Sequence, residues 1–229
     1  MNKSAFKYLI PLLLILLLVN CKRKPPAESA EGQIKFKISY AQEKVGGYST
    51  SFLPKEMIME YSNNMVKSTI AGGLGFFVLV NVSNLKSYQH TTWLKFIDKK
   101  YIYEGDKRES PCCFGMLADM QLEFTNKTKE ITGLICKHAI ASFRNNEIEP
   151  FDIWYTDELG IVNPNSNSPF NDIPGVLLEF NTLMGNANMH MVATSRSIQK
   201  IPPKQFMAPN NYRPVTKEEI DRILEALMN

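Results

Sequence analysis

A regular alternation of apolar and polar residues begins at Gln33 and returns through most of the chain. Ile34, Phe36, Ile38 and Tyr40 are apolar or aromatic, and polar residues stand between them. A period of two places successive side chains on opposite faces, so this stretch predicts a half-buried β-strand. Further strands are predicted for the segments 57–61, 65–70, 76–82, 88–96, 101–103, 122–124, 131–139, 151–155, 173–180 and 189–198.

Only the C-terminal end of the chain predicts a helix. Thr216 and Glu219 have the spacing of a capping box, in which the threonine side chain accepts from the amide of the glutamate. The apolar residues between Ile220 and Leu227 then recur at helical spacing. Many short strands followed by one amphipathic helix predict a mainly β protein with a meandering antiparallel sheet.

The first residues read as a targeting segment. Lys3 and Lys7 precede an apolar run from Tyr8 to Val19, which is too short to span a bilayer and fits a signal peptide over residues 1–20. Cys21 follows the run directly, as in a bacterial lipobox, although Asn20 stands where a smaller residue is usual. We expect Cys21 to carry the lipid (palmitate-type acyl chains), and the alternative is an ordinary secretory signal with an incidental cysteine.

A polar, charged and proline-containing stretch follows Cys21 and predicts a flexible tether over residues 21–32. The remaining residues, 33–229, are expected to form a single domain. Because Lys22 is not an aspartate, the sorting rule for such lipoproteins predicts the outer membrane, with the domain facing the periplasm. Exposure at the cell surface stays open as an alternative. The expected partner is therefore the membrane.

The charge balance argues against nucleic acids as partners. The chain has 26 Lys and Arg against 23 Asp and Glu, a net charge of +3. Removal of Lys3 and Lys7 with the signal peptide leaves 24 against 23, a net charge of +1. A nearly neutral protein lacks the basic footprint of a nucleic-acid-binding protein. We expect a monomer.

Three cysteines remain after Cys21, namely Cys112, Cys113 and Cys136. An oxidising compartment would permit a bridge from Cys136 to one of the adjacent pair. An odd number does not suit a disulfide framework, however, so free and partly buried thiols are the expected state.

No pattern of catalytic residues is present in the sequence. The histidines His90, His138 and His190 lie in separate predicted strands, and neither a His-Glu-x-x-His nor a Gly-x-Ser-x-Gly motif occurs. The sequence therefore predicts a protein that is not an enzyme and needs no cofactor. Met189, His190 and Met191 offer soft ligands for copper, but on a strand the histidine would face away from the two methionines. A copper site there is a weaker alternative.

One block of the chain resembles a known family. The quoted residues are Ile131-Thr-Gly133, Cys136-Lys137, Ala139, Trp154-Tyr-Thr-Asp-Glu158 and Ile173-Pro-Gly-Val-Leu-Leu-Glu179. They resemble a family of small exported proteins known by a Gly-Leu-Pro-Gly-Leu-Ile signature, and a sibling family of lipoproteins of unknown function. This sequence departs from the pattern at Leu134, His138, Asp172-Ile173 and Val176. Proteins of this kind are similar to the periplasmic lipoprotein carriers.

The resemblance implies a curved, incomplete antiparallel β-barrel of about 8–10 strands with a C-terminal helix over its mouth. It implies no activity. We therefore expect an outer-membrane lipoprotein that binds an apolar ligand, such as an acyl chain or lipid, in the curved sheet. The alternatives are a structural or interaction lipoprotein of the envelope without a ligand, and a copper-binding protein. The residues expected to line the ligand site are Phe36, Met57, Met59, Trp154, Tyr155 and Phe180.

Overall fold

The computed structural model describes residues 31–72, 75–105, 112–113, 117, 119–144 and 148–228 of the protein. The expected signal peptide and Cys21 lie outside these residues, as does nearly all of the tether. Lipidation of Cys21 and the outer-membrane location therefore stay predictions. Among the described residues, no helix combines the length and apolar character needed to cross a membrane.

Twelve strands form one open sheet in the order β14-β8-β7-β6-β5-β4-β1-β13-β12-β11-β10-β9. Their bounds are β1 Gly32–Tyr40, β4 Glu56–Ser62, β5 Met65–Gly72, β6 Phe77–Asn84, β7 His90–Phe96, β8 Lys99–Gly105, β9 Met120–Ile131, β10 Leu134–Phe143, β11 Phe151–Thr156, β12 Val176–Met184, β13 Ala187–Ile198 and β14 Arg213–Pro214. All neighbours run antiparallel except β14 and β8, which are parallel. A separate two-stranded hairpin joins β2 Lys44–Val45 to β3 Tyr48–Ser49.

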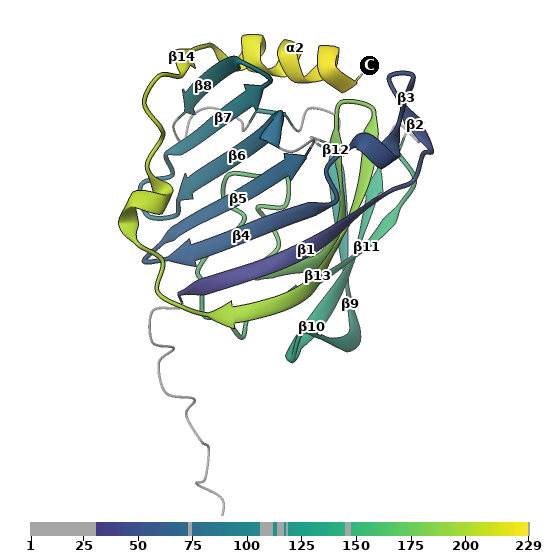
Figure 1. Ribbon diagram of the computed structural model, residues 1–229. Coiled ribbons are helices and arrows are strands. Elements are labelled where there is room, and N and C mark those ends of the chain that lie inside the picture. The colour runs from purple at the N-terminus through teal and green to yellow at the C-terminus, as the bar shows by residue number, and fades with distance from the viewer. Residues whose placement is uncertain are drawn as a thin grey trace, which may run out of the picture.

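The sheet bends into a cup with two walls. Strands β4 to β8 form one wall and strands β9 to β13 the other, and β1 lies between β4 and β13 where the walls meet (Figure 1). Three register shifts fall in the second wall and at the junction, beside Lys35/Phe36, Lys137/His138 and Trp154/Tyr155. Bulges bend a strand and increase its twist, so these positions help to turn the sheet back on itself.

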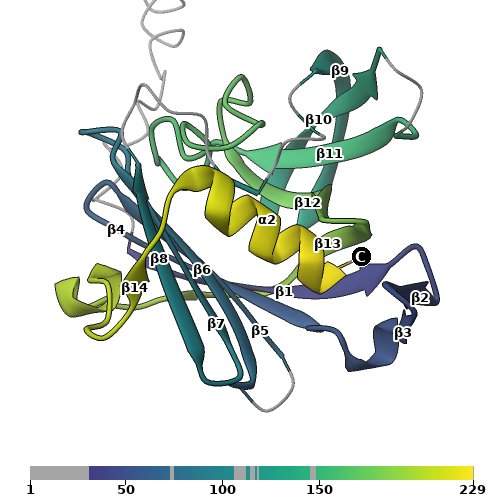
Figure 2. The same cartoon turned by 90° about the horizontal axis from the view of Figure 1, so that it is seen from above.

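Helix α2 (Lys217–Met228) lies across the open end of the cup, between β8 and β12 (Figure 2). It buries Ile220, Leu224 and Met228 against the core. One half of the predicted capping box is present, because Glu219 N donates to Thr216 Oγ1 at 3.3 Å. The Glu219 carboxylate does not complete the box. It pairs instead with Arg213, at 2.6 Å.

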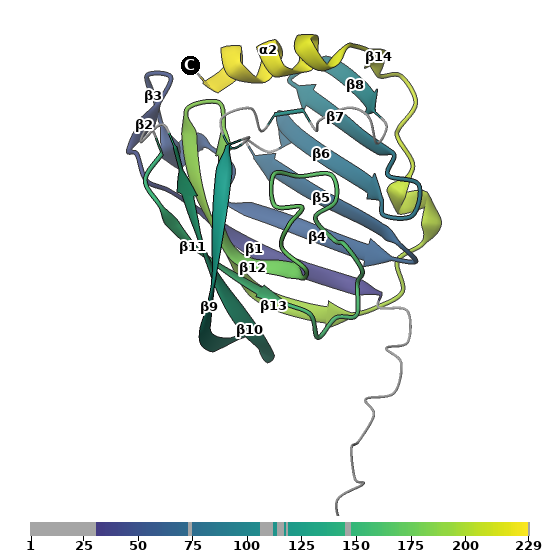
Figure 3. The same cartoon turned by 180° about the vertical axis from the view of Figure 1, so that it is seen from behind.

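The concave side is filled partly by the segment between β11 and β12. In Figure 3 this segment crosses in front of the strands of the first wall. Its residues Phe170 and Ile173 are buried in the main core, where Phe170 packs on Phe180 with ring centroids 5.5 Å apart.

The tail between β13 and α2 takes the opposite side of the sheet. It contains the 3₁₀ helix η5 (Pro203–Phe206), while a second 3₁₀ helix, η2 (Thr50–Phe52), follows β3. Phe206, Ala208 and Tyr212 pack against a small outer cluster of Val80, Val82 and Trp93. The first wall is therefore covered on both faces.

The predicted fold class is confirmed: the protein is mainly β, with an open, curved antiparallel sheet and a C-terminal helix. The sheet has twelve strands rather than 8–10. Two predicted strands were misplaced at their starts. Thr132 and Gly133 form the turn between β9 and β10 and both have positive φ values, and β12 begins at Val176 rather than Ile173. The described cysteines Cys112, Cys113 and Cys136 are free thiols.

Candidate functional site

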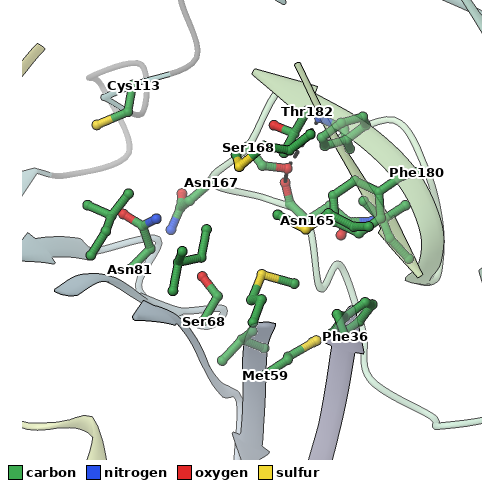
Figure 4. Close-up of a pocket in the computed structure, with 18 of the residues that line it drawn as sticks. Phe36, Met59, Ser68, Asn81, Cys113, Asn165, Asn167, Ser168, Phe180 and Thr182 are labelled. Atoms are coloured by element: carbon green, nitrogen blue, oxygen red, sulfur yellow. Dashed lines mark hydrogen bonds between the residues drawn. The ribbon is translucent and has the colours of Figure 1, made fainter. Parts of the chain in front are cut away.

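A cavity of about 160 Å³ lies on the concave side of the sheet, between the two walls. Strands β1, β4, β5 and β6 supply one side of it, and β12 and β13 supply the other. The segment between β11 and β12 closes it further, with Asn165, Asn167, Ser168 and Phe170. Figure 4 shows these residues converging from both walls and the connecting segment.

One end of the cavity is aromatic and rich in methionine. The Phe36 and Phe180 rings meet edge to face with centroids 6.2 Å apart. Met57 and Met59 extend this surface from β4, while β13 contributes a further pair of methionines. Flexible thioether side chains adapt to irregular shapes, so this end can accommodate apolar groups of a ligand.

The other end carries amide side chains. Figure 4 places Asn81 and Asn167 near each other, away from the aromatic end. Thr92 Oγ1 donates to Asn81 Oδ1 at 2.6 Å, so the Asn81 amide nitrogen is the group that can donate to a ligand. Asn165 lies closer to Phe180 than to Asn81 in Figure 4, and its Nδ2 donates to the carbonyl oxygens of Ile173 at 3.0 Å and Gly175 at 2.8 Å. Its side-chain oxygen is therefore the group that can accept.

Thr182 lies in the wall of the cavity, and its hydroxyl is buried there. Its residue is only 6% exposed, and Oγ1 forms no hydrogen bond with any described residue. A buried hydroxyl without a partner costs about 1–3 kcal/mol. A rotation of this side chain would turn the unpaired hydroxyl toward the cavity, where a polar group of a ligand could satisfy it.

None of the described lining residues is an Asp, Glu, His, Lys or Arg. Among these described lining residues the only titratable group is Cys113, whose pKa is raised by its hydrogen bond to Cys112 and by burial. The cavity therefore offers hydrogen bonds and apolar contact to a neutral ligand, and not a pair of groups for proton transfer.

Four of the six residues expected to line a site lie around this cavity, namely Phe36, Met57, Met59 and Phe180. The structure does not bring Trp154 and Tyr155 to it. The Trp154 ring packs on His138, with centroids 4.4 Å apart, and Lys129 Nζ lies 4.2 Å from its centroid. Tyr155 is buried and packs edge to face on Phe124.

The three residues of the alternative copper site point in two directions. Met189 and Met191 are buried and line the cavity. His190 faces the other side of the sheet, where Nδ1 lies 2.7 Å from Asn181 Oδ1. The pairing of β1 with this part of β13 contains no bulge that would turn the histidine toward the methionines.

The other two histidines are themselves buried and contact neighbouring side chains. His138 is fully buried, with Nδ1 2.8 Å from Thr125 Oγ1 and Nε2 2.8 Å from Asp152 Oδ1. His90 is also buried and stacks edge to face on Tyr103. Neither residue lines the cavity.

Sequence reasoning missed the polar half of the cavity, although a signal for it exists. In β6, Asn81 occupies the same face as Leu79, and in β12 Thr182 shares a face with Phe180 and Met184. A polar residue that shares a face with buried apolar residues lies against the core, and where it is buried, as Thr182 is, it needs a partner. The amides of the β11–β12 segment carry no comparable periodic signal.

Comparison with known families gives one match over more than half of the chain. Residues 88–222 match the family model described as "N-glycanase peptide, N-terminal domain". The matched residues extend from the start of β7 into α2 and include the second wall of the cup. A comparison with curated proteins gives no match.

Solved structures with a similar fold include two of PNGF-II. The structure in space group P21 aligns with a TM-score of 0.54 at 16% identity, covering 86% of this chain and 33% of that one. The structure in space group C2 aligns with a TM-score of 0.51 at 18% identity, covering 87% of this chain and 32% of that one. This chain thus spans about a third of the length of either structure, and the likeness concerns the fold.

These matches correct the expectations drawn from the resemblance. The expected relationship to the Gly-Leu-Pro-Gly-Leu-Ile family and the lipoprotein carriers is wrong, because the chain matches the N-glycanase family model and the fold of PNGF-II instead. Among the residues that carried the resemblance, Gly175 lies in a tight turn. A Cβ atom there would lie 2.5 Å from Thr156 O. The expectations of a lipoprotein that binds an apolar ligand and of a protein that is not an enzyme are likewise overturned, because the matched family is named for an N-glycanase.

Proposed function

Because the chain belongs to the family of the N-glycanase peptide, N-terminal domain, we propose that it works as a domain of an N-glycanase. An N-glycanase is by its name an enzyme that acts on N-linked glycans. We propose that the cavity of the cup binds the N-acetylglucosamine core of such a glycan. The observation that carries this proposal is the unpaired, buried hydroxyl of Thr182 in the cavity wall.

The chemistry of the lining fits an N-acetylated sugar. An acetamido group has a methyl end and an amide end, and the cavity has a methionine and aromatic end and an amide end. The Asn81 amide nitrogen can donate to the acetamido oxygen, and Asn165 Oδ1 can accept from its N–H. The sugar is uncharged, which agrees with a described lining free of charged residues, since an unpaired buried charge is costly.

The proposal is tested by titrating the protein with N,N′-diacetylchitobiose, and with cellobiose as the matched sugar without acetamido groups. We expect saturable chitobiose binding with a Kd of about 1 mM or tighter, and no saturation with cellobiose. Isothermal calorimetry or chemical-shift changes would measure both.

A pair of matched variants locates the binding site. Thr182→Val removes the cavity hydroxyl at nearly constant volume and should weaken chitobiose binding roughly 5- to 30-fold, the equivalent of one hydrogen bond. Thr91→Val makes the same chemical change in β7 at a residue that does not line the cavity, and should leave the affinity unchanged. Failure of the folded wild-type protein to bind chitobiose, or equal binding to cellobiose, would refute the proposal.

A further inference from the structure

Two thiols and one carboxylate converge where α2 meets the segment between β8 and β9. The ligand atoms of Cys112, Cys113 and Asp221 all lie within 4.8 Å of one another. Cys113 and Asp221 are 108 positions apart in sequence, so the fold creates this group. We propose that these three residues form a binding site for a thiophilic divalent metal ion, of which Zn²⁺ is the reference case.

The spacing of the donor atoms suits a tetrahedral ion. Zinc binds cysteine sulfur at about 2.3 Å and carboxylate oxygen at about 2.0 Å, which places neighbouring ligand atoms roughly 3.5–3.8 Å apart. The three donor atoms lie within 4.8 Å of one another, so they need to close by about 1.3 Å at most. Two sulfurs and one oxygen leave a fourth position for water or a ligand, as in zinc sites that are not purely structural.

Asp221 is already held in position for this role. Cys113 N donates to Asp221 Oδ1 at 2.6 Å, and Lys217 Nζ, one helical turn earlier, pairs with Oδ2 at 2.9 Å. A carboxylate has about four lone-pair sites, so two hydrogen bonds leave capacity for a metal ion. Both contacts orient the carboxylate and leave lone pairs free for a metal ion.

The charges of the group balance when an ion is added. Two thiolates and one carboxylate carry a charge of −3, a divalent ion contributes +2 and Lys217 contributes +1, which gives a neutral site.

A buried hydrogen-bond chain joins this group to the cavity. Cys112 is 1% exposed, and its Sγ donates to Thr92 Oγ1 at 3.3 Å, which in turn donates to Asn81 Oδ1 at 2.6 Å. Cys113 itself belongs to the cavity lining, and Figure 4 shows it apart from the other labelled residues. A metal-bound Cys112 thiolate cannot donate, so Thr92 Oγ1 would turn its proton from Asn81 Oδ1 to the sulfur when an ion binds. Such hydrogen bonds behind the ligands of a metal site orient them and tune the affinity.

The experiment uses the full chain, freed of metal and kept reduced by a phosphine. Zn²⁺ is titrated against a chromophoric chelator, and Co²⁺ is titrated as a spectroscopic substitute. We expect one equivalent of Zn²⁺ with a Kd below about 1 μM, and a Co²⁺ complex with near-ultraviolet charge-transfer bands from two thiolates. Cys113→Ser and Asp221→Asn should each weaken binding at least about tenfold.

Cys136→Ser is the matched control. Cys136 is buried, as Cys112 is, but its Sγ contacts Leu134 O at 3.6 Å and it is not part of the converging group. This variant should bind both ions as the wild type does. Lack of a tight equivalent in the wild type, or equal binding in Cys113→Ser, would overturn the proposal. If the serine variant does not fold, the wild-type Co²⁺ spectrum decides, because bands from two thiolates support the site and their absence refutes it.

Discussion

Gly185 and Met228 lie so close that a Cβ atom on Gly185 would stand 2.6 Å from the Cβ atom of Met228. Gly185 belongs to the turn between β12 and β13, and Met228 is the last residue of α2. The end of the helix therefore rests directly on the backbone of this turn. Because Gly185 also has a φ of +54°, the position favours glycine for two reasons.

We predict that Gly185→Ala will lower the free energy of unfolding by about 2–3 kcal/mol, measured by urea denaturation. Gly133→Ala is the matched control. Gly133 also has a positive φ, of +78°, but a Cβ atom there would meet no heavy atom within 4 Å. Gly133→Ala should lower the free energy of unfolding only by the cost of placing alanine at a positive φ, about 1 kcal/mol. Equal losses in the two variants would show that the contact with Met228 does not matter.

Two buried threonines allow a second comparison. Thr156 Oγ1 donates to Ile135 O at 3.0 Å and accepts from Glu158 N at 3.2 Å, whereas Thr182 Oγ1 has no partner among the described residues. We predict that Thr156→Val will destabilise the protein by about 1–3 kcal/mol, because two polar groups lose their partner. Thr182→Val should be neutral or stabilising. Calorimetric melting of both variants without ligand would measure the difference, and a similar loss in both would contradict it.

Most strands were predicted from the alternation of apolar and polar side chains. Ile34, Phe36 and Ile38 alternate as predicted and are almost completely buried in β1. The helix was predictable because its cap and its apolar face follow local rules. The position of β1 between β4 and β13 was not predictable, because the pairing with β13 joins residues 149 to 166 positions apart. Local patterns do not specify such pairings.

The candidate site was predictable only in part, for a related reason. Residues on the concave face can be identified from their phase in a strand, as for Met57, Met59 and Phe36. Trp154 and Tyr155 could not be placed in this way, because β11 has a bulge between them and the cavity ends before it reaches either. The amide end depends on how the β11–β12 segment folds back, which is a tertiary property.

Cys136 makes a prediction about alkaline pH. Burial raises the pKa of this thiol to about 11, above its usual value of 9. The folded state thus holds the proton more tightly than the unfolded state. The stabilisation is complete below pH 9 and is lost as the pH rises through 11, at roughly 1 kcal/mol per pH unit in that interval.

We therefore expect urea denaturation at pH 7.5, 9 and 10.5 to show a steeper loss of stability in the wild type than in Cys136→Ala. The variant will be less stable at pH 7.5 because it loses buried volume, so the comparison concerns the slope and not the absolute value. Buried tyrosines such as Tyr61 have raised pKa values as well, and their contribution is common to both proteins. Identical slopes would show that Cys136 does not titrate in this range.

The last prediction concerns the tail that covers the outer face of the first wall. Phe206 packs on the cluster of Val80, Val82 and Trp93, whereas its neighbour Met207 is 69% exposed. Phe206→Ala should lower the free energy of unfolding by about 1–2 kcal/mol, less than for a fully buried phenylalanine, because this ring is only half-buried. Met207→Ala removes a side chain of similar size from the next position and should change stability by no more than about 0.5 kcal/mol.

Hydrogen exchange adds a local test of the tail. The amide of Val215 donates to Ile102 O at 2.9 Å, and in Phe206→Ala it should exchange faster, because the tail that positions β14 is loosened. Unchanged exchange at Val215 together with wild-type stability would mean that β14 and α2 hold their positions without the packing of the tail.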